Sequence, residues 1–219
     1  MACTHDHFVA THAKFRSRTG HLQAFQLPGI CVCVCRTVAR RIIDSDNSCL
    51  FNAVGYSIER TRKAAPKLRR VVQSTVAGDP YTFNSAFLGR ENAEYQEWIL
   101  NPQNWGGAIE LFILSQHFQC EISAFDIQTQ RVDTYGQDEG YTQRCMVVYD
   151  GLHYDALAVA AFPDAPEEVD CTLVDVNSPD LDQVRVPVLP NVVTLCLCLL
   201  APKSTNTMPA DCSSCQGAC

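Results

Sequence analysis

The sequence lacks any apolar run long enough to cross a membrane. The best candidate, residues 192–200, is about half of the roughly 18 residues that a membrane-spanning helix needs. The N-terminus also lacks the positively charged segment and apolar stretch of a secretory signal. A net charge of −7 excludes the basic surface typical of nucleic-acid-binding proteins. We therefore expect no membrane and no nucleic-acid partner, and a location in the cytoplasm, with the nucleus as a second place.

Thirteen cysteines in 219 residues raise the question of disulfides or metal. The count is odd and no secretory signal accompanies it, so a reducing compartment is expected. Cys212 and Cys215 have the spacing of half a zinc site, and Cys219 adds a third ligand at most. A structural zinc site needs four ligands, so we expect no metal and no cofactor.

The hydrophobic patterning divides the chain into three zones. Residues 1–36 show no sustained periodicity and are expected to be a poorly ordered extension, whereas residues 37–163 carry the strong patterns. Residues 164–219 are expected to form an irregular C-terminal extension. Within the central zone, strands are predicted at 37–43, 121–127, 131–135 and 144–149, and helices after Asn47 or Ser48, from Pro66, from Asn92 and over 108–118. Helices followed by strands predict an α+β fold.

Cys49 follows a short polar turn and begins an amphipathic segment. A helix N-terminus and a nearby imidazolium both stabilise a thiolate, which makes this cysteine a candidate nucleophile. The backbone amides of the turn from Asp46 to Cys49 are candidates for binding an oxyanion. The alternative is a small buried hydrophobic residue, which is the more common role of a free cysteine.

His153 and Asp155 follow an apolar run and a glycine-containing turn. Residues two apart share one face of an extended strand, so the Asp155 carboxylate is placed to accept a hydrogen bond from the imidazole. Such a pair holds the tautomer that takes a proton from a thiol. The alternative is a surface histidine beside a surface aspartate.

A third block contains Trp105, Gly106 and Gly107. The two glycines allow close approach of a backbone or of a thin substrate, and Trp105 is a candidate wall for a substrate channel. The alternative is a helix cap with a core tryptophan, and the spacing alone leaves both open.

Three segments together resemble the ovarian-tumour (OTU) family of cysteine deubiquitinases: residues 44–51, 105–111 and 149–155. The resemblance covers about residues 37–163 and is strongest to the branch associated with the valosin-containing AAA ATPase, in its plant and algal versions. It implies a small mixed sheet packed between helical layers. It also implies a thiol protease that cleaves isopeptide bonds at the C-terminal glycine of ubiquitin without a cofactor, in protein quality control and degradation.

The resemblance assigns a role to each candidate residue. Cys49 would be the nucleophile, His153 the general base and Asp155 the residue that orients the histidine. Asp46 would shape the oxyanion loop, and Trp105, Gly106 and Gly107 would line the channel for the ubiquitin tail.

Two departures from the family pattern concern partners. Many relatives carry a ubiquitin-like domain that docks the ATPase, for which residues 1–36 are too short, and the tail lacks the histidines of the usual zinc finger. Ubiquitin and polyubiquitin chains are the expected partners, while ATPase docking stays open. The rival functions are an inactive ubiquitin-binding module and a cysteine hydrolase for another ubiquitin-like modifier.

Overall fold

The computed structural model describes residues 37–161 and 165–178. The expectations for residues 1–36 and for Cys212, Cys215 and Cys219 lie outside the described residues. Within the described residues, no helix has the length and apolar character to span a membrane.

The core of the fold is a mixed sheet whose strands lie in the order β1-β5-β4-β2-β3, with β6 added beside β4. β2 and β4 run parallel, and the other pairs are antiparallel. The strands are β1 (Thr37–Arg41), β2 (Glu121–Asp126), β3 (Arg131–Tyr135), β4 (Gln143–Tyr149), β5 (Tyr154–Ala160) and β6 (Val174–Asp175). The predicted strand at 37–43 therefore ends two residues early, so that residues 42 and 43 leave the sheet just before the nucleophile turn.

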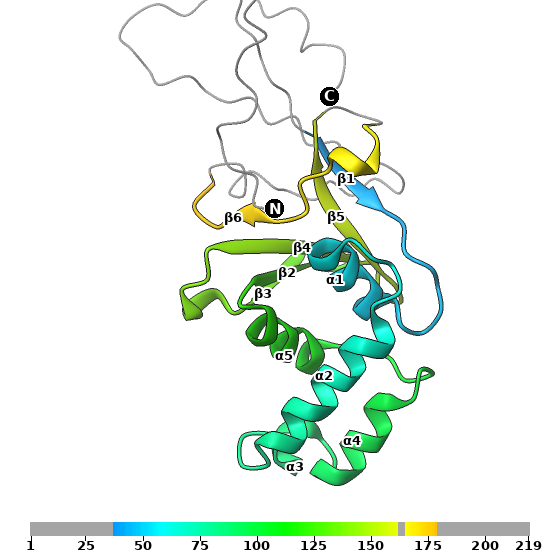
Figure 1. Cartoon of the computed structure of the whole chain (residues 1–219), viewed down its shortest axis with the longest axis vertical. Helices are drawn as coiled ribbons and strands as arrows, with labels where there is room; N and C mark the ends of the chain where they lie inside the picture. Colours follow the sequence, from blue (N-terminus) through cyan, green and yellow to red (C-terminus); the bar gives the residue numbers. More distant parts are fainter. Residues whose placement is uncertain (1–36, 162–164, 179–219) are drawn as a thin grey trace, which may run out of the picture.

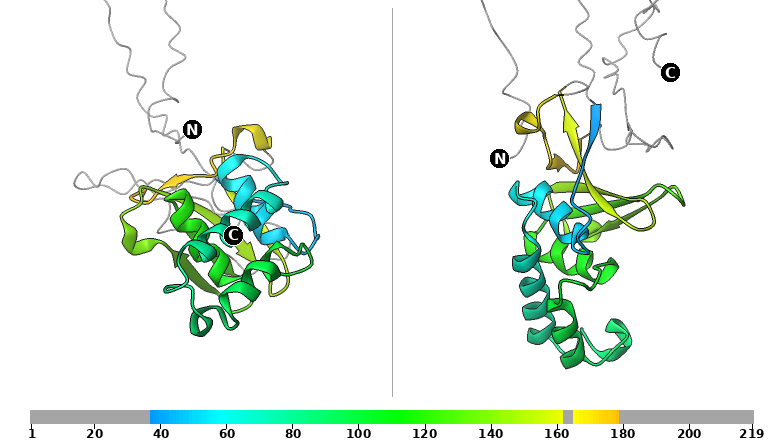
Figure 2. Two further views of the ribbon diagram at one scale, coloured as in Figure 1. Left: turned by 60° about the horizontal axis from the view of Figure 1, so that its bottom comes forward. Right: turned by 90° about the vertical axis from the view of Figure 1, so that its right-hand side faces the viewer.

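Five α-helices occupy the described chain between β1 and β2: α1 (Cys49–Glu59), α2 (Ala65–Gly78), α3 (Ser85–Leu88), α4 (Asn92–Leu100) and α5 (Ala108–Phe118). Short 3₁₀ turns follow later, η1 (Gln137–Glu139) and η2 (Glu167–Val169). In Figure 1, α1 and α5 lie against the sheet, while α2, α3 and α4 extend away from it; the right view of Figure 2 shows the same arrangement. The helices expected after Ser48, near Pro66, from Asn92 and at 108–118 are all present.

Helix α1 is buried on nearly all sides, because β5 and β4 contact it on one side and α2 on the other. Every residue from Leu50 to Ser57 is buried. The sequence pattern alone indicated one apolar face with Leu50, Val54 and Ile58. The polar Asn52 and Ser57 are buried because the helix lies inside the domain, and this central position holds its N-terminal residue, Cys49, in a fixed place.

Alternate residues of the strands enter two separate apolar clusters, as the two-residue repeat of a strand requires. In β4, Cys145 and Val147 join the main cluster with the helices, whereas Met146 and Val148 join a smaller one on the other face. The smaller cluster has only strand and turn residues among its described members. The mixed α+β fold is thus confirmed, and within the described residues the two helices that pack on the sheet, α1 and α5, lie on the face of the main cluster.

Residues 165–178 pack directly onto this sheet. Val159 at the end of β5 exchanges two backbone hydrogen bonds with Cys171, of 2.8 and 2.9 Å. β6 then pairs with the start of β4, where Val174 lies opposite Arg144. The sheet therefore extends past residue 163, where the central zone of the sequence pattern ends.

Candidate active site

Cys49 is the first residue of α1 and is half-buried. Ser48 occupies the N-cap position, but its side chain makes no capping hydrogen bond. The Asp46 carboxylate instead accepts hydrogen bonds from the Ser48 amide at 3.0 Å and from the Asn52 side chain at 3.2 Å. Asn47 between them has φ of 61°, in the left-handed region that asparagine tolerates better than most residues. Asp46 therefore holds the turn that presents Cys49.

The groups around the Cys49 sulfur have opposite effects on the pKa of its thiol. Burial raises the pKa of the thiol, the backbone amides of Tyr154 and Leu50 lower it, and the Asp46 charge raises it; the net result lies above the ordinary thiol value. The depressed pKa expected for a cysteine at a helix N-terminus is thus not found in this conformation, because half-burial outweighs the amides. Helix α1 packs against β5, the strand that begins directly after His153.

His153 lies in the turn before β5, and its Nε2 approaches two acceptors. The Asp155 Oδ1 atom lies 3.1 Å away and the Ile43 carbonyl oxygen 3.0 Å away. Neither the carbonyl nor an ionised carboxylate can donate, so Nε2 carries the proton. The neutral ring then has its lone pair on Nδ1, which is the atom able to accept a proton.

The Nδ1 atom is paired with the Ser45 hydroxyl, at 3.2 Å. Among the described residues, the Cys49 thiol and the His153 ring share no direct hydrogen bond. Proton transfer from Cys49 therefore requires Nδ1 to exchange the serine hydroxyl for the thiol, a local adjustment of a kind common in unliganded active sites. Ser45 had no role in the sequence interpretation.

Asp155 is the most completely satisfied group of the site, and its side chain is only 1% exposed. Besides the histidine, its Oδ1 accepts from the Ile43 amide at 2.6 Å, and its Oδ2 accepts from Arg40 Nε at 2.6 Å. The structure thus brings His153 and Asp155 together as the strand spacing indicated. Arg40 was missed, because nothing local marks an arginine in β1 as the partner of a residue 115 positions later.

The turn before His153 is fixed by Asp150, whose Oδ1 accepts from the amides of Leu152 and His153 at 3.1 and 2.8 Å. Burial raises the pKa of Asp150, but these amides and the Arg40 charge outweigh it, so the net pKa is lowered. Gly151 adopts φ of 100°, and a Cβ there would lie 2.3 Å from the Gln128 side chain. A residue with a side chain would be strained at this φ and would displace the Gln128 side chain, which donates to the Asp150 carbonyl.

Trp105, Gly106 and Gly107 form the loop before α5. The Trp105 side chain is 54% exposed, which excludes a core role, and its Nε1 donates to the Asn47 side chain at 2.8 Å. A Cβ at Gly106 would lie 3.1 Å from the Phe51 ring, so this glycine allows the loop to pack against α1. Gly107 is the N-cap residue of α5, and its amide donates to Glu110 at 2.6 Å. The structure therefore places this loop beside the nucleophile turn.

Arg69 of α2 joins the nucleophile turn to the loop before α5. This residue was not identified from the sequence. The residue is 2% exposed and its guanidinium stacks on the Phe51 ring at 4.3 Å. It donates to Asn47 and Ser48 of the nucleophile turn, and its other acceptors are the carbonyl oxygens of Ile99, Pro102 and Asn104. Burial lowers the pKa of Arg69, and the charges of Glu110 and Asp46 only partly offset this.

No group of three or more possible metal ligands occurs within the part of the chain that the structure describes. The site consists instead of a thiol at a helix N-terminus, a histidine at the start of the neighbouring strand, and a buried carboxylate that orients the histidine. These are the components of a cysteine hydrolase.

The chain belongs to the OTU-like cysteine protease family, whose sequence profile matches residues 44–163. This match confirms the resemblance stated from the three motifs. The solved structure of an OTU domain in complex with ubiquitin superposes with a TM-score of 0.60 and 30% identity, covering 67% of this chain and 80% of that one. The OTU fold is thereby confirmed as well.

Curated relatives come from plants, slime moulds and animals. The ovarian tumor domain-containing deubiquitinating enzyme 2 of Arabidopsis thaliana is 53% identical over 140 residues, which make up 64% of this chain and 67% of the relative. Ubiquitin thioesterase OTU1 of Dictyostelium discoideum is 49% identical and that of Homo sapiens 44%, each over 64% of this chain. The chain spans only 44% and 40% of the length of these two relatives.

Proposed function

We propose that this chain is a thiol-dependent deubiquitinase that hydrolyses the bond at the C-terminal glycine of ubiquitin. The observation that carries the proposal is the 3.2 Å contact between His153 Nδ1 and the hydroxyl of Ser45, four residues before Cys49, since it brings the His153–Asp155 pair to the turn that presents the candidate nucleophile. The names of the relatives, which include deubiquitinating enzyme and ubiquitin thioesterase, supply the substrate.

The proposed reaction begins when His153 Nδ1 takes the proton of the Cys49 thiol. The thiolate attacks the carbonyl carbon of the terminal glycine, and amides at the start of α1 stabilise the oxyanion that forms. The Ser48 amide is held by Asp46 and is not available for this purpose, whereas the Cys49 amide, the first of α1, is a candidate donor. Asp46 thus acts by shaping the loop.

The intermediate collapses when the imidazolium gives its proton to the leaving lysine amine, which breaks the isopeptide bond and leaves a thioester. His153 then takes a proton from water, and the resulting hydroxide attacks the thioester to release the ubiquitin carboxylate and the thiol. Asp155 keeps the proton on Nε2 throughout and stabilises the imidazolium. No cofactor takes part in these steps.

The proposed substrate channel passes between the nucleophile turn and the loop of Trp105, Gly106 and Gly107. Exposed Trp105 is hydrogen-bonded to Asn47, two residues before Cys49, so it lies where an extended peptide would reach the thiol. Polyubiquitin chains as substrates, a role in quality control and degradation, action in the cytoplasm and nucleus, and association with the valosin-containing AAA ATPase are further parts of the proposal.

The test is covalent labelling by ubiquitin that carries a thiol-reactive group in place of its terminal carboxylate, with Cys49→Ala as the matched variant. We expect a 1:1 adduct with the wild-type protein and none with the variant, although the variant keeps its fold and still binds ubiquitin.

Binding of ubiquitin without an adduct by a folded wild-type protein would contradict the proposal and indicate an inactive binding module. The raised pKa of the Cys49 thiol and the engaged Nδ1 atom make this the rival to exclude. Adducts with probes made from other ubiquitin-like modifiers, but not with ubiquitin, would instead indicate a different modifier as substrate.

A further inference from the structure

The four residues 40–43 contribute most of the hydrogen bonds that orient the His153–Asp155 pair. Arg40 Nε and the Ile43 amide donate to the two Asp155 oxygens, and the Ile43 carbonyl accepts from His153 Nε2. The ladder between β1 and β5 ends at Arg41, so residues 42 and 43 have no pairing with β5. Their position must therefore be fixed by other contacts.

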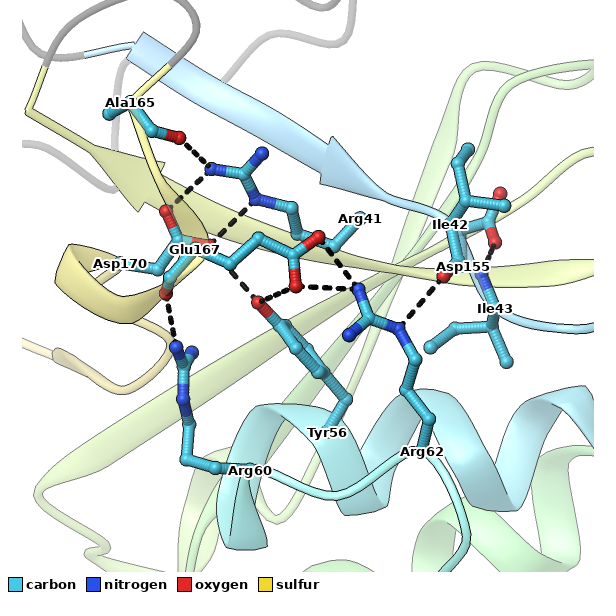
Figure 3. A network of polar contacts seen from close by, with 10 residues as sticks. All are labelled: Arg41, Ile42, Ile43, Tyr56, Arg60, Arg62, Asp155, Ala165, Glu167 and Asp170. Carbon is cyan, nitrogen blue, oxygen red and sulfur yellow. Dashed lines mark hydrogen bonds and ion pairs between the residues drawn. The ribbon is translucent and has the colours of Figure 1, made fainter.

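The segment that follows β5 holds the neighbouring Arg41 directly, and it reaches residue 42 through Arg62, which lies between α1 and α2. Arg41 donates from Nε and Nη2 to the two Asp170 oxygens, both at 2.7 Å, and from Nη2 to the Ala165 carbonyl at 2.9 Å. Arg62 donates from Nε to the Ile42 carbonyl at 3.0 Å and from Nη2 to both Glu167 oxygens at 2.8 Å. Figure 3 shows these contacts on one side of the residue 41–43 backbone and Asp155 on the other.

The pair of Arg41 and Asp170 is the anchor of this cluster. The Asp170 side chain is 0% exposed and that of Arg41 is 14% exposed, whereas Arg62 and Glu167 are 34% and 41% exposed, and ion pairs contribute less as their exposure to water increases. The hydrogen bond to Asp170 raises the pKa of Arg41 against the effect of burial. A two-point charged contact out of water fixes both position and orientation.

Tyr56 of α1 also contacts this cluster. Its hydroxyl has Asp170 at 3.1 Å and Glu167 at 3.3 Å as acceptors for its single proton, and the Arg60 and Arg62 cations lie over its ring. Burial raises the pKa of Tyr56 to about 12, with the Arg60 charge opposing, so the hydroxyl remains a donor. Asp170 therefore contacts both α1, through Tyr56, and the segment 40–43 that orients His153, through Arg41.

We propose that Asp170 is a positioning residue for the His153–Asp155 pair, and that it acts through Arg41 and the backbone of residues 41–43. The proposal rests on the proposed function for its kinetic consequence. Asp170 lies outside the family profile, which ends at residue 163, so under this proposal a segment beyond the profile sets the geometry of the catalytic centre.

The test compares three full-chain variants of the same segment with the wild type. Asp170→Asn keeps the shape but removes the charge and turns one acceptor into a donor that faces Arg41. Val174→Ala removes buried volume from the same segment without touching residues 40–43. Asp175→Asn makes the same chemical change at an exposed residue whose side chain accepts hydrogen bonds from Asn177.

For hydrolysis of a fluorogenic amide at the ubiquitin C-terminus, we expect kcat of Asp170→Asn to fall about tenfold or more. The KM should stay within about twofold, since uniform binding of ubiquitin is not altered. Val174→Ala, although less stable, and Asp175→Asn should keep the wild-type kcat at a temperature where all variants are folded. Wild-type kcat in Asp170→Asn, or an equal loss in Val174→Ala, would overturn the proposal.

A second measurement does not depend on ubiquitin. The nitrogen-15 signals of the His153 ring should report a fixed tautomer with the proton on Nε2 in the wild type and in both controls, and tautomer averaging in Asp170→Asn. An unchanged ring signal in Asp170→Asn would overturn the positioning role. A wild type that does not cleave ubiquitin would contradict the proposed function instead, while the ring signals still decide the role of Asp170.

Discussion

Cys49 lies between groups that favour its thiolate and groups that disfavour it. The amides of Tyr154 and Leu50 stabilise the anion, whereas burial and the Asp46 carboxylate destabilise it. The same carboxylate holds the Ser48 amide and so shapes the turn. One residue therefore organises the site and at the same time restrains its nucleophile.

This balance gives a prediction about pH. Because the pKa of the Cys49 thiol is raised, the neutral thiol is favoured, and alkylation of Cys49 by iodoacetamide should rise with pH through a midpoint above that of a cysteine-containing peptide. Asp46→Asn removes a negative charge near the sulfur and should move the midpoint to lower pH. Mass spectrometry of the Cys49 peptide measures the rate at this site despite the other cysteines.

Asp44→Asn serves as the control, since Asp44 lies in the same turn but is not among the charges that shift the thiol pKa. It should leave the midpoint unchanged. A wild-type midpoint below that of the peptide, or equal shifts in the two variants, would contradict this account of the thiol.

Sequence reasoning found the residues whose roles are visible in short segments. Cys49 after a polar turn, and His153 two positions from Asp155, are local patterns, and the structure places them in one site. Arg40 acts on a residue 115 positions away. Such contacts depend on which strands become neighbours, and no periodicity encodes that.

At the level of elements, the nucleophile turn and the loop before α5 behave as one unit, because Arg69 of α2 bonds to both. The Arg69 acceptors are neutral carbonyl and hydroxyl oxygens, so its contribution is geometric as much as electrostatic. A lysine carries the same charge but cannot match the planar, multi-point guanidinium.

We predict that Arg69→Lys lowers the free energy of unfolding by about 2 kcal/mol or more, because buried acceptors lose their donors. It should also raise KM and lower kcat for the ubiquitin substrate, since the loop of Trp105 and the turn of Cys49 both shift. Chemical denaturation and steady-state kinetics measure the two effects.

Arg70, the next residue of α2, is exposed and provides the matched substitution. Arg70→Lys should change stability by less than about 0.5 kcal/mol and leave both kinetic constants in place. If Arg69→Lys behaved like Arg70→Lys, the two loops would not depend on the buried guanidinium.

Elements with a clear hydrophobic periodicity were predicted, whereas α3, β5 and β6 were not. Helix α5 and strands β2 to β4 lie close to their expected bounds, because each carries enough alternation or helical spacing to be distinguished. Strand β5 was not predicted, because the segment with His153 and Asp155 was interpreted as a catalytic motif. Strand β6 has only two residues. Such a strand forms only because an edge of β4 is available to it.

At the scale of the whole molecule, residues 165–178 complete the domain rather than follow it. They contribute to the sheet through the Val159–Cys171 pair and β6, to the second apolar cluster through Val174, and to the site through Asp170. A boundary drawn at the end of the family match would remove a buried carboxylate and leave Arg41 without it. Such a truncation would disturb catalysis and folding together, so it cannot separate the two roles.

Hydrogen exchange of the native full chain tests whether this segment unfolds with the sheet. The Cys171 amide donates to the Val159 carbonyl at 2.9 Å, and the Val159 amide donates back at 2.8 Å. If the segment is part of the cooperative unit, both amides open only in global unfolding and should show protection close to that of Leu157 inside β5. The exposed residues of η1 provide the fast-exchanging reference. Rapid exchange at Cys171 beside a protected Leu157 would mean that the segment opens independently, and the positioning of His153 by Asp170 would then be intermittent.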